Sequence, residues 1–145
     1  QSTYSKNIIN KYGSYGGPGG YIMDLPVISG ATNLQGVVYY NPSPGCSQCD
    51  YIPDNIYTAY PSLNEWHHVA FVVSSTELKL YIDGNLKKSE PRSSLTDMHT
   101  SISDLYLGSA APSFGESKPL YGLVDEARVY DRALTDSEIV DVMNG

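Results

Sequence analysis

Residues 66–88 read WHHVAFVVSSTELKLYIDGNLKK, which is the pattern of consecutive antiparallel strands. Apolar and polar residues alternate over residues 77–82, as expected of a strand with one buried face. Asp83-Gly84 then predicts a two-residue hairpin leading into residues 85–88. Residues 66–73 are largely apolar in both alternating sets, which predicts a central strand covered on both faces.

Similar short segments bounded by turn residues occur on both sides of this hairpin. They predict strands at residues 7–12, 21–25, 35–40, 103–108 and 120–130. The chain closes differently, with Thr135 and Glu138 spaced as a capping box and Leu134 and Ile139 as a hydrophobic staple. These signals predict one short helix over residues 136–143. The whole pattern is typical of a single all-β domain, an antiparallel β-sandwich with one short C-terminal helix, over residues 1–145.

The charge of the chain limits its partners. The 145 residues carry 9 Lys and Arg against 16 Asp and Glu, a formal net charge of −7. Nucleic-acid binding needs clustered basic residues, and anionic membranes repel an acidic face, so neither is expected as a partner. The longest purely apolar stretches are about five residues long, such as Val69–Val73, so no membrane insertion is expected.

Tyrosine dominates the aromatic residues, with 13 Tyr against two Phe and one Trp. Nine of these tyrosines lie in residues 1–60, a stretch that is also rich in Gly and Pro and poor in charge. Tyrosine joins an apolar ring to a polar tip, which suits contact surfaces, although a half-buried place on a sheet would also explain it. The candidate contact residues for a sugar or another subunit are Tyr15, Tyr39, Tyr40, Tyr51 and Tyr57.

Cys46 and Cys49 are the only two cysteines. One Cys-x-x-Cys pair supplies two of the four ligands that zinc needs, and a thioredoxin-type motif expects a βαβ context that this chain lacks. A local disulfide that pins the Pro- and Gly-rich loop is the favoured interpretation, with an interchain disulfide as the alternative. Either one predicts an extracellular or cell-surface location.

Four motifs in order over residues 64–145 resemble a LamG-like domain of the concanavalin A-like jelly rolls. They are NEWHHVAFVV at 64–73, LKLYIDGN at 78–85, LYLG at 105–108, and YGLVDEARVYDRAL at 121–134 followed by the capped helix. The resemblance implies an antiparallel jelly-roll sandwich. It also implies a structural calcium near Asp125, whose further carboxylate ligands would come from Asp24, Asp50 or Asp54.

Strands that open this family's pattern do not precede residues 7–12 in this chain. Three explanations stand side by side. The sequence is a fragment of a longer chain, the Tyr-rich loops rebuild the sheet, or a neighbouring chain supplies the strand, since an unpaired edge is a template for strand addition.

No catalytic constellation is evident. Asp125 and Glu126 are neighbours on a predicted strand, so they would point to opposite faces and could not work as a glycosidase pair. A nucleophile-elbow motif is also absent. We therefore expect a non-catalytic extracellular module that self-assembles as a filament, tube or surface layer under calcium control, with glycan recognition as the alternative function.

Overall fold

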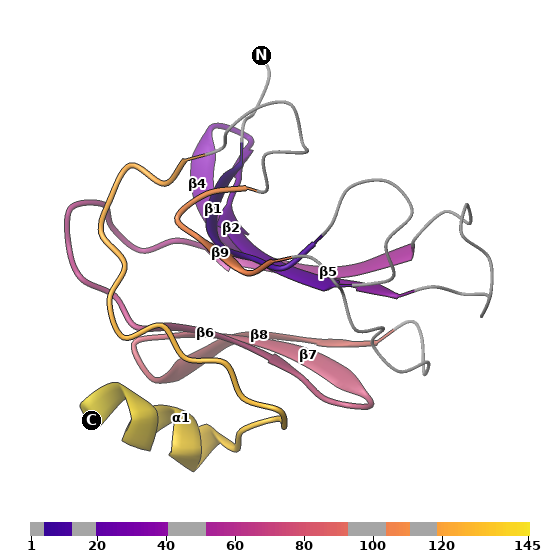
Figure 1. Cartoon of the computed structure of the whole chain (residues 1–145). Helices are drawn as coiled ribbons and strands as arrows, with labels where there is room; N and C mark the ends of the chain where they lie inside the picture. Colours follow the sequence, from indigo (N-terminus) through magenta and orange to yellow (C-terminus); the bar gives the residue numbers. More distant parts are fainter. Residues whose placement is uncertain (1–4, 13–19, 41–51, 93–103, 111–118) are drawn as a thin grey trace.

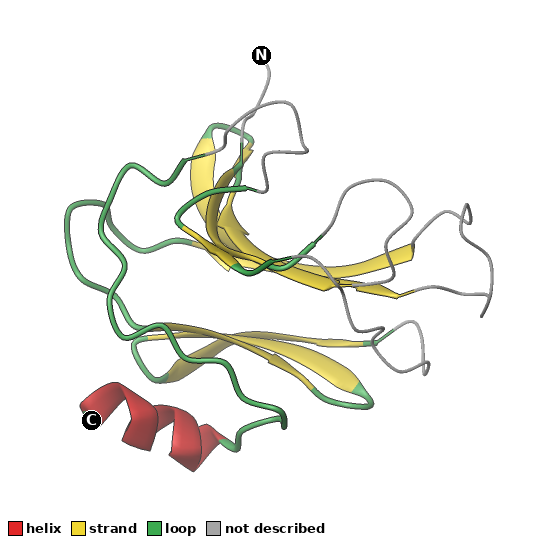
Figure 2. Ribbon diagram, in the orientation of Figure 1, coloured by secondary structure: helices red, strands yellow, loops and turns green. Residues whose placement is uncertain are grey.

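The computed structural model describes residues 5–12, 20–40, 52–92, 104–110 and 119–145. Two antiparallel sheets face each other, and a helix lies on the outer side of the second sheet (Figures 1 and 2). The elements in chain order are β1 (Lys6–Asn10), β2 (Gly20–Leu25), β3 (Val27–Ile28), β4 (Ala31–Tyr40), β5 (Ile52–Ala59), β6 (Val69–Val73), β7 (Glu77–Ile82), β8 (Asn85–Pro91), β9 (Tyr106–Leu107) and α1 (Asp136–Asn144). This arrangement confirms the predicted all-β sandwich of jelly-roll type with one C-terminal helix.

The first sheet has the strand order β3-β4-β2-β1-β9, and β5 also pairs with β4. β4 is the long central strand, paired with β2 along one side and with β5 along the other. The sequence did not predict β5, because Pro53, Asp54 and Asn55 favour a loop. Among the residues that the structure describes, β5 pairs only with β4, and an edge position makes such residues tolerable because part of its backbone stays unpaired.

The second sheet has the order β6-β7-β8. Asp83 and Gly84 both have positive φ, 52° and 70°, which confirms the predicted two-residue hairpin between β7 and β8. The prediction for β6 is corrected in part. It is covered on both faces, as expected, but in the described part of the chain it pairs only with β7 and lies at the sheet edge.

The core fills the space between the two sheets. Its buried members are Leu25, Leu34, Val38, Ile56, Leu78, Leu80 and Ile82. Gly36 on β4 lies close against Phe71 on β6, because a Cβ placed on Gly36 would lie 2.5 Å from the Phe71 ring. Glycine at this position therefore lets the aromatic ring lie flat against the opposite sheet.

A second apolar cluster joins the second sheet to α1. Val72, Tyr81 and Ile139 are buried together, with Leu134 packed against them. The Tyr81 hydroxyl donates to Asp136 Oδ1 at 2.6 Å. Burial, followed by this hydrogen bond, raises the pKa of Tyr81 well above its usual range. The helix therefore explains why both faces of β6 and β7 contain apolar residues.

The N-terminus of α1 has the predicted capping box. The Glu138 amide donates to Thr135 Oγ1 at 3.3 Å, and the Thr135 amide donates to Glu138 Oε2 at 2.8 Å. In the part of the chain that the structure describes, no helix has the length and apolar character needed to cross a membrane.

Candidate functional site

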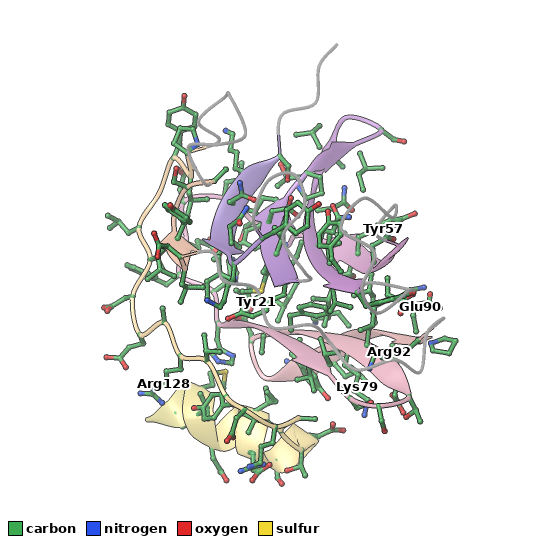
Figure 3. All side chains as sticks on the ribbon, turned by 45° about the vertical axis from the view of Figure 1, so that its right-hand side comes forward. Tyr21, Tyr57, Lys79, Glu90, Arg92 and Arg128 are labelled. Atoms are coloured by element: carbon green, nitrogen blue, oxygen red, sulfur yellow. The ribbon has the colours of Figure 1, made fainter. Side chains whose placement is uncertain are left out.

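The predicted tyrosine contact residues that the structure describes have different environments. Tyr57 on β5 is exposed and projects from the first sheet (Figure 3). Tyr40 is only 2 % exposed, so it is a core side chain and presents no contact surface, which corrects its predicted role. It is buried because it ends the central strand β4 on the face that packs inward. Tyr15 and Tyr51 lie outside the described residues.

Tyr39 is half-buried and stacks on Tyr12, with 4.1 Å between the ring centroids and 27° between the ring planes. Burial, with smaller contributions from Tyr12 and Asp24, raises the pKa of Tyr39 to about 12. The phenol is therefore neutral at any physiological pH. This pair packs one end of β4 against the chain that follows β1, which is a structural role.

Each described carboxylate of the predicted calcium site has another partner in the structure. Asp24 is buried on β2, where Ser5 donates a hydrogen bond to it. Asp125 is exposed, and its Oδ1 accepts the amide of Glu126. Asp54 is buried beside Arg92, at 3.9 Å. Among the described residues, no group of three or more His, Cys, Asp or Glu side chains could hold a metal ion, and the implied calcium stays a prediction.

The disulfide prediction falls on Cys46 and Cys49, which lie outside the described residues, as does Asp50. The predicted pairing of these cysteines therefore stays a prediction.

Residues 120–130 differ most from the prediction, and we call them the crossing segment. They form no strand within the described chain and instead run from the first sheet down to α1 (Figure 1). At its upper end, the Leu120 amide donates to the carbonyl of Gly108 at 2.8 Å. At its lower end it leads into Leu134 and α1.

The crossing segment exposes its apolar side chains. Tyr121 is 81 % exposed and Leu123 is 79 % exposed, and Val124, Val129 and Tyr130 are also exposed. Beneath it lies an open hollow of about 610 Å³, lined by Leu107, Gly108, Leu120, Gly122, Val124, Asp125, Glu126 and Ala127. The sequence predicted the strand character of this segment, but not that it would leave these side chains in water.

Glu126 bends the crossing segment. Its φ of 51° is in the left-handed region, which is uncommon for a residue with a side chain. Two local contacts hold the bend: its amide donates to Asp125 Oδ1 at 2.8 Å, and its carboxylate pairs with Arg128 at 2.8 Å. Arg128 lies on the stretch that approaches α1 (Figure 3).

A second exposed feature is the loop before β6. It carries Trp66, the one tryptophan of the chain, which is 66 % exposed, and Leu63 beside it is also exposed. The side chain of His67 anchors this loop. Its Nδ1 lies 2.9 Å from Asp83 Oδ2, and its Nε2 lies 3.0 Å from Ser62 Oγ. The loop is therefore held in one shape while its aromatic residue faces solvent.

The contacts among Ser62, His67 and Asp83 follow the order of a nucleophilic triad. However, the Ser62 hydroxyl also lies 2.7 Å from the carboxylate of Glu65. A negative charge at this place would oppose the oxyanion that forms in acyl transfer. We therefore assign these residues a structural role, as a brace for the loop.

Comparison with known proteins agrees with the architecture. The family model described as the concanavalin A-like lectin/glucanases superfamily, of laminin G type, matches residues 10–140. Comparison with curated proteins gave no match. A solved structure, an S-layer domain-containing protein from Clostridium thermocellum, is 18% identical with a TM-score of 0.39, and the match covers 99% of this chain and 65% of that chain. Because the family model covers most of the sequence, the chain belongs to the concanavalin A-like lectin/glucanase superfamily.

Proposed function

We propose that this chain is a non-catalytic structural or adhesive module of the cell exterior that associates with copies of itself. The observation that carries the proposal is the exposed apolar surface of the crossing segment. Contiguous exposed apolar patches mark contact sites, because water is displaced from them when a partner binds.

The free energy available from these side chains is comparable with the cost of association. Burial of one large apolar side chain contributes about 1.5–3 kcal/mol. Tyr121, Leu123, Val129 and Tyr130 together would therefore gain a free energy of the same order as the cost of association, about 4–15 kcal/mol. We therefore expect weak association that becomes visible only at high protein concentration.

The absence of catalysis is part of the proposal. Laminin G-like domains are generally binding modules, and the Ser62–His67–Asp83 contacts act as a brace. Placement outside the cell rests on the predicted disulfide between Cys46 and Cys49. Calcium control stays a prediction, tested by adding a chelator to any polymer that forms.

Light scattering after size-exclusion chromatography, over a wide range of protein concentrations, tests self-association, and negative-stain microscopy tests for polymers. We expect the mass to rise with concentration. The variant Leu123→Ser should weaken association about tenfold, which corresponds to about 1.4 kcal/mol. Leu86→Ser is the matched control, because Leu86 is an exposed leucine on β8. A monomer at every concentration, with no polymer in the images, would overturn the proposal.

Trp66 supports glycan recognition as a second candidate function. An exposed indole on a braced loop offers a flat face to the C–H groups of a sugar, and the carboxylate of Glu65 offers an acceptor for its hydroxyls. A glycan array would identify a ligand, and calorimetry with Trp66→Ala and Trp66→Phe would assign the site. We expect loss of binding in the alanine variant and partial retention in the phenylalanine variant. If both variants bind the glycan as tightly as the parent protein does, this loop is excluded as the site.

A further inference from the structure

His68 lies where the entry of β6 meets the turn between β7 and β8. Its amide donates to Asp83 Oδ1 at 3.1 Å, and its carbonyl accepts the Asp83 amide at 2.8 Å. These two hydrogen bonds fix its backbone. Burial lowers the pKa of the His68 ring, Asp83 opposes this effect, and Arg128 adds to the lowering. The crossing segment therefore reaches this junction through Arg128.

The surroundings of the His68 ring suit its neutral form. Its Nδ1 is buried and has no hydrogen-bond partner among the described residues. A neutral ring carries a proton on only one of its two nitrogens, whereas a charged ring carries a proton on both. The proton on Nδ1 would then need an acceptor, and a buried donor without one is costly.

The groups that face His68 offer little to a second proton. From the turn, Asp83 attracts it, but both carboxylate oxygens already accept hydrogen bonds, one from the His67 ring and one from the His68 amide. From the crossing segment, Arg128 repels it. Helix α1 meets the same turn through the apolar side chain of Met143. Protonation of His68 therefore strains the junction.

The crossing segment is the part of this junction that has least to hold it. Its ends are attached by the bond from the Leu120 amide to Gly108 and by the packing of Leu134. Between these ends it passes from the first sheet to α1 (Figure 1), and residues 121–130 are all exposed. A segment with few buried contacts separates at low cost.

Arg128 keeps its charge at every pH at which the protein is folded, because a guanidinium does not lose its proton in proteins. The carboxylate of Glu126 pairs with it at 2.8 Å, but both side chains are exposed, which weakens the pair. A proton on His68 therefore brings two positive charges together. The backbone of His68 is fixed, so the side that yields is the crossing segment.

We propose that protonation of His68 releases the crossing segment from the entry of β6, so that mild acid weakens the self-association of this module. This inference rests on the self-association proposed above and names its regulation. Leu123 and Val129 lie on the released segment, and both belong to the exposed apolar surface. A loose segment must be ordered when it binds, which makes association less favourable.

The direction of the pH effect follows from the lowered pKa of His68. The held form binds the proton less readily than the released form, whose ring has the ordinary pKa of 6.5. The held form is therefore complete above pH 6.5 and gives way as the pH falls toward its own, lower pKa.

Nuclear magnetic resonance on the full chain, from about pH 7.5 to about pH 5, tests the release. We expect the backbone amides of residues 123–130 to shift toward random-coil values with the same midpoint as the His68 ring. In His68→Gln, whose side chain stays neutral, these amides should keep their positions. His99→Gln is the matched control, because it removes another histidine of the chain, and it should behave like the parent.

Arg128→Gln tests the same step without a change to the buried ring. It removes the repulsion and should reduce the acid-dependent shifts of the segment. Arg132→Gln is its control. Circular dichroism checks that each variant is folded.

Light scattering over the same pH range connects the release to assembly. Acid also lowers the net negative charge as the pH approaches the pI of about 4.7, which favours association in every variant. The effect of His68 has the opposite sign. We therefore expect association of the parent, relative to H68Q, to weaken about tenfold between neutral and acidic pH.

Amides of residues 123–130 that stay in place while the His68 ring titrates would overturn the release. Release with equal association of the parent and H68Q at every pH would overturn the regulation and leave self-association standing. A protein that is monomeric at every pH would overturn self-association and the regulation with it, whatever the segment does.

Discussion

His67 Nδ1 lies 2.9 Å from Asp83 Oδ2, which ties the entry of β6 to the turn between β7 and β8. The same carboxylate accepts the amide of His68 at 3.1 Å through its other oxygen. Asp83 thus serves two purposes: its backbone makes the hairpin turn, and its side chain fixes the chain that enters the neighbouring strand. Trp66 owes its fixed exposed position to this contact, because it directly precedes His67.

Replacing Asp83 with asparagine should therefore destabilise the protein. Asparagine keeps the turn geometry but loses the charge that the His67 ring bonds. We expect a loss of about 1–2 kcal/mol in the free energy of unfolding, measured in urea. Asp104→Asn, at an exposed carboxylate before β9, is the control and should change little. An unchanged stability in D83N would show that the contact is dispensable.

Acid should weaken the same contact. Desolvation opposes ionisation of Asp83, but hydrogen bonds from His67 and from the His68 amide outweigh it and lower the pKa of this carboxyl. A lowered carboxyl pKa adds stability above the unfolded-state value near 3.8, and this part is lost as the pH falls through the folded-state value. Urea unfolding below pH 4 should show this loss in the parent protein and not in D83N.

His68 should give a second pH effect at higher pH. Burial lowers the pKa of His68 below 6.5, and Arg128 adds to the lowering, while Asp83 opposes it. The folded protein therefore binds this proton less readily than the unfolded chain. Stability is complete above pH 6.5 and falls as the pH drops toward the folded-state pKa.

A nuclear magnetic resonance titration of His68 measures this shift. Arg128→Gln should raise the pKa of His68 toward its usual value, because it removes a nearby positive charge. Arg132→Gln is the control, since Arg132 pairs with Glu138 on α1. An identical His68 titration in the parent and R128Q would show that the crossing segment does not approach β6 in solution.

The regular half of the fold could be predicted from sequence because its signals are local. Alternation in residues 77–82, the Asp83-Gly84 turn and the capping box at Thr135 each depend on neighbours in the chain. The structure confirms all three, and β7 has the predicted bounds. β5 was missed because its pairing with β4 comes from tertiary contacts that outweigh the poor strand propensity of Pro53 and Asp54.

The crossing segment and β6 show where prediction from the sequence fails. Both have strand-like sequences, and both predictions assumed strand neighbours that sequence cannot supply. Strand propensity reports that a segment can pair, whereas pairing itself depends on which edge is available. For the same reason the tyrosine-rich first part gave candidates that the structure separates, with Tyr40 in the core and Tyr57 on the surface.

Packing of Gly36 against Phe71 leads to a further prediction. A methyl group on Gly36 would meet the ring at 2.5 Å, and Phe71 is held between the two sheets. Gly36→Ala should therefore lower the free energy of unfolding by about 1–3 kcal/mol through overpacking. Gly122→Ala, whose nearest neighbour atom lies at 3.7 Å, should be well tolerated.

A double variant identifies the cause. Adding Phe71→Leu to G36A should restore part of the lost stability, because the smaller side chain makes room for the methyl group. Such coupling between two contacting residues is measured as the deviation from additivity. Strict additivity of the two losses would show that the ring and the glycine do not meet.

Capping at Thr135 decides whether α1 stays on the second sheet. Thr135→Ala removes the hydroxyl that accepts the Glu138 amide and should cost about 1 kcal/mol in the free energy of unfolding. Hydrogen bonds from Arg132, then from the amide and hydroxyl of Thr135, lower the pKa of Glu138 to about 2. Because this pKa is lowered, the contribution of Glu138 is complete above pH 4.5 and is lost as the pH falls toward 2.

Amide hydrogen exchange within α1 measures this effect directly. Faster exchange in T135A than in Ser137→Ala, the neighbouring control, is expected, because Thr135 fills the N-cap position. The effect should reach Tyr81, whose hydroxyl bonds Asp136 in the first turn of the helix. Since α1 also covers Val72 of β6, loosening the cap should expose this side chain as well.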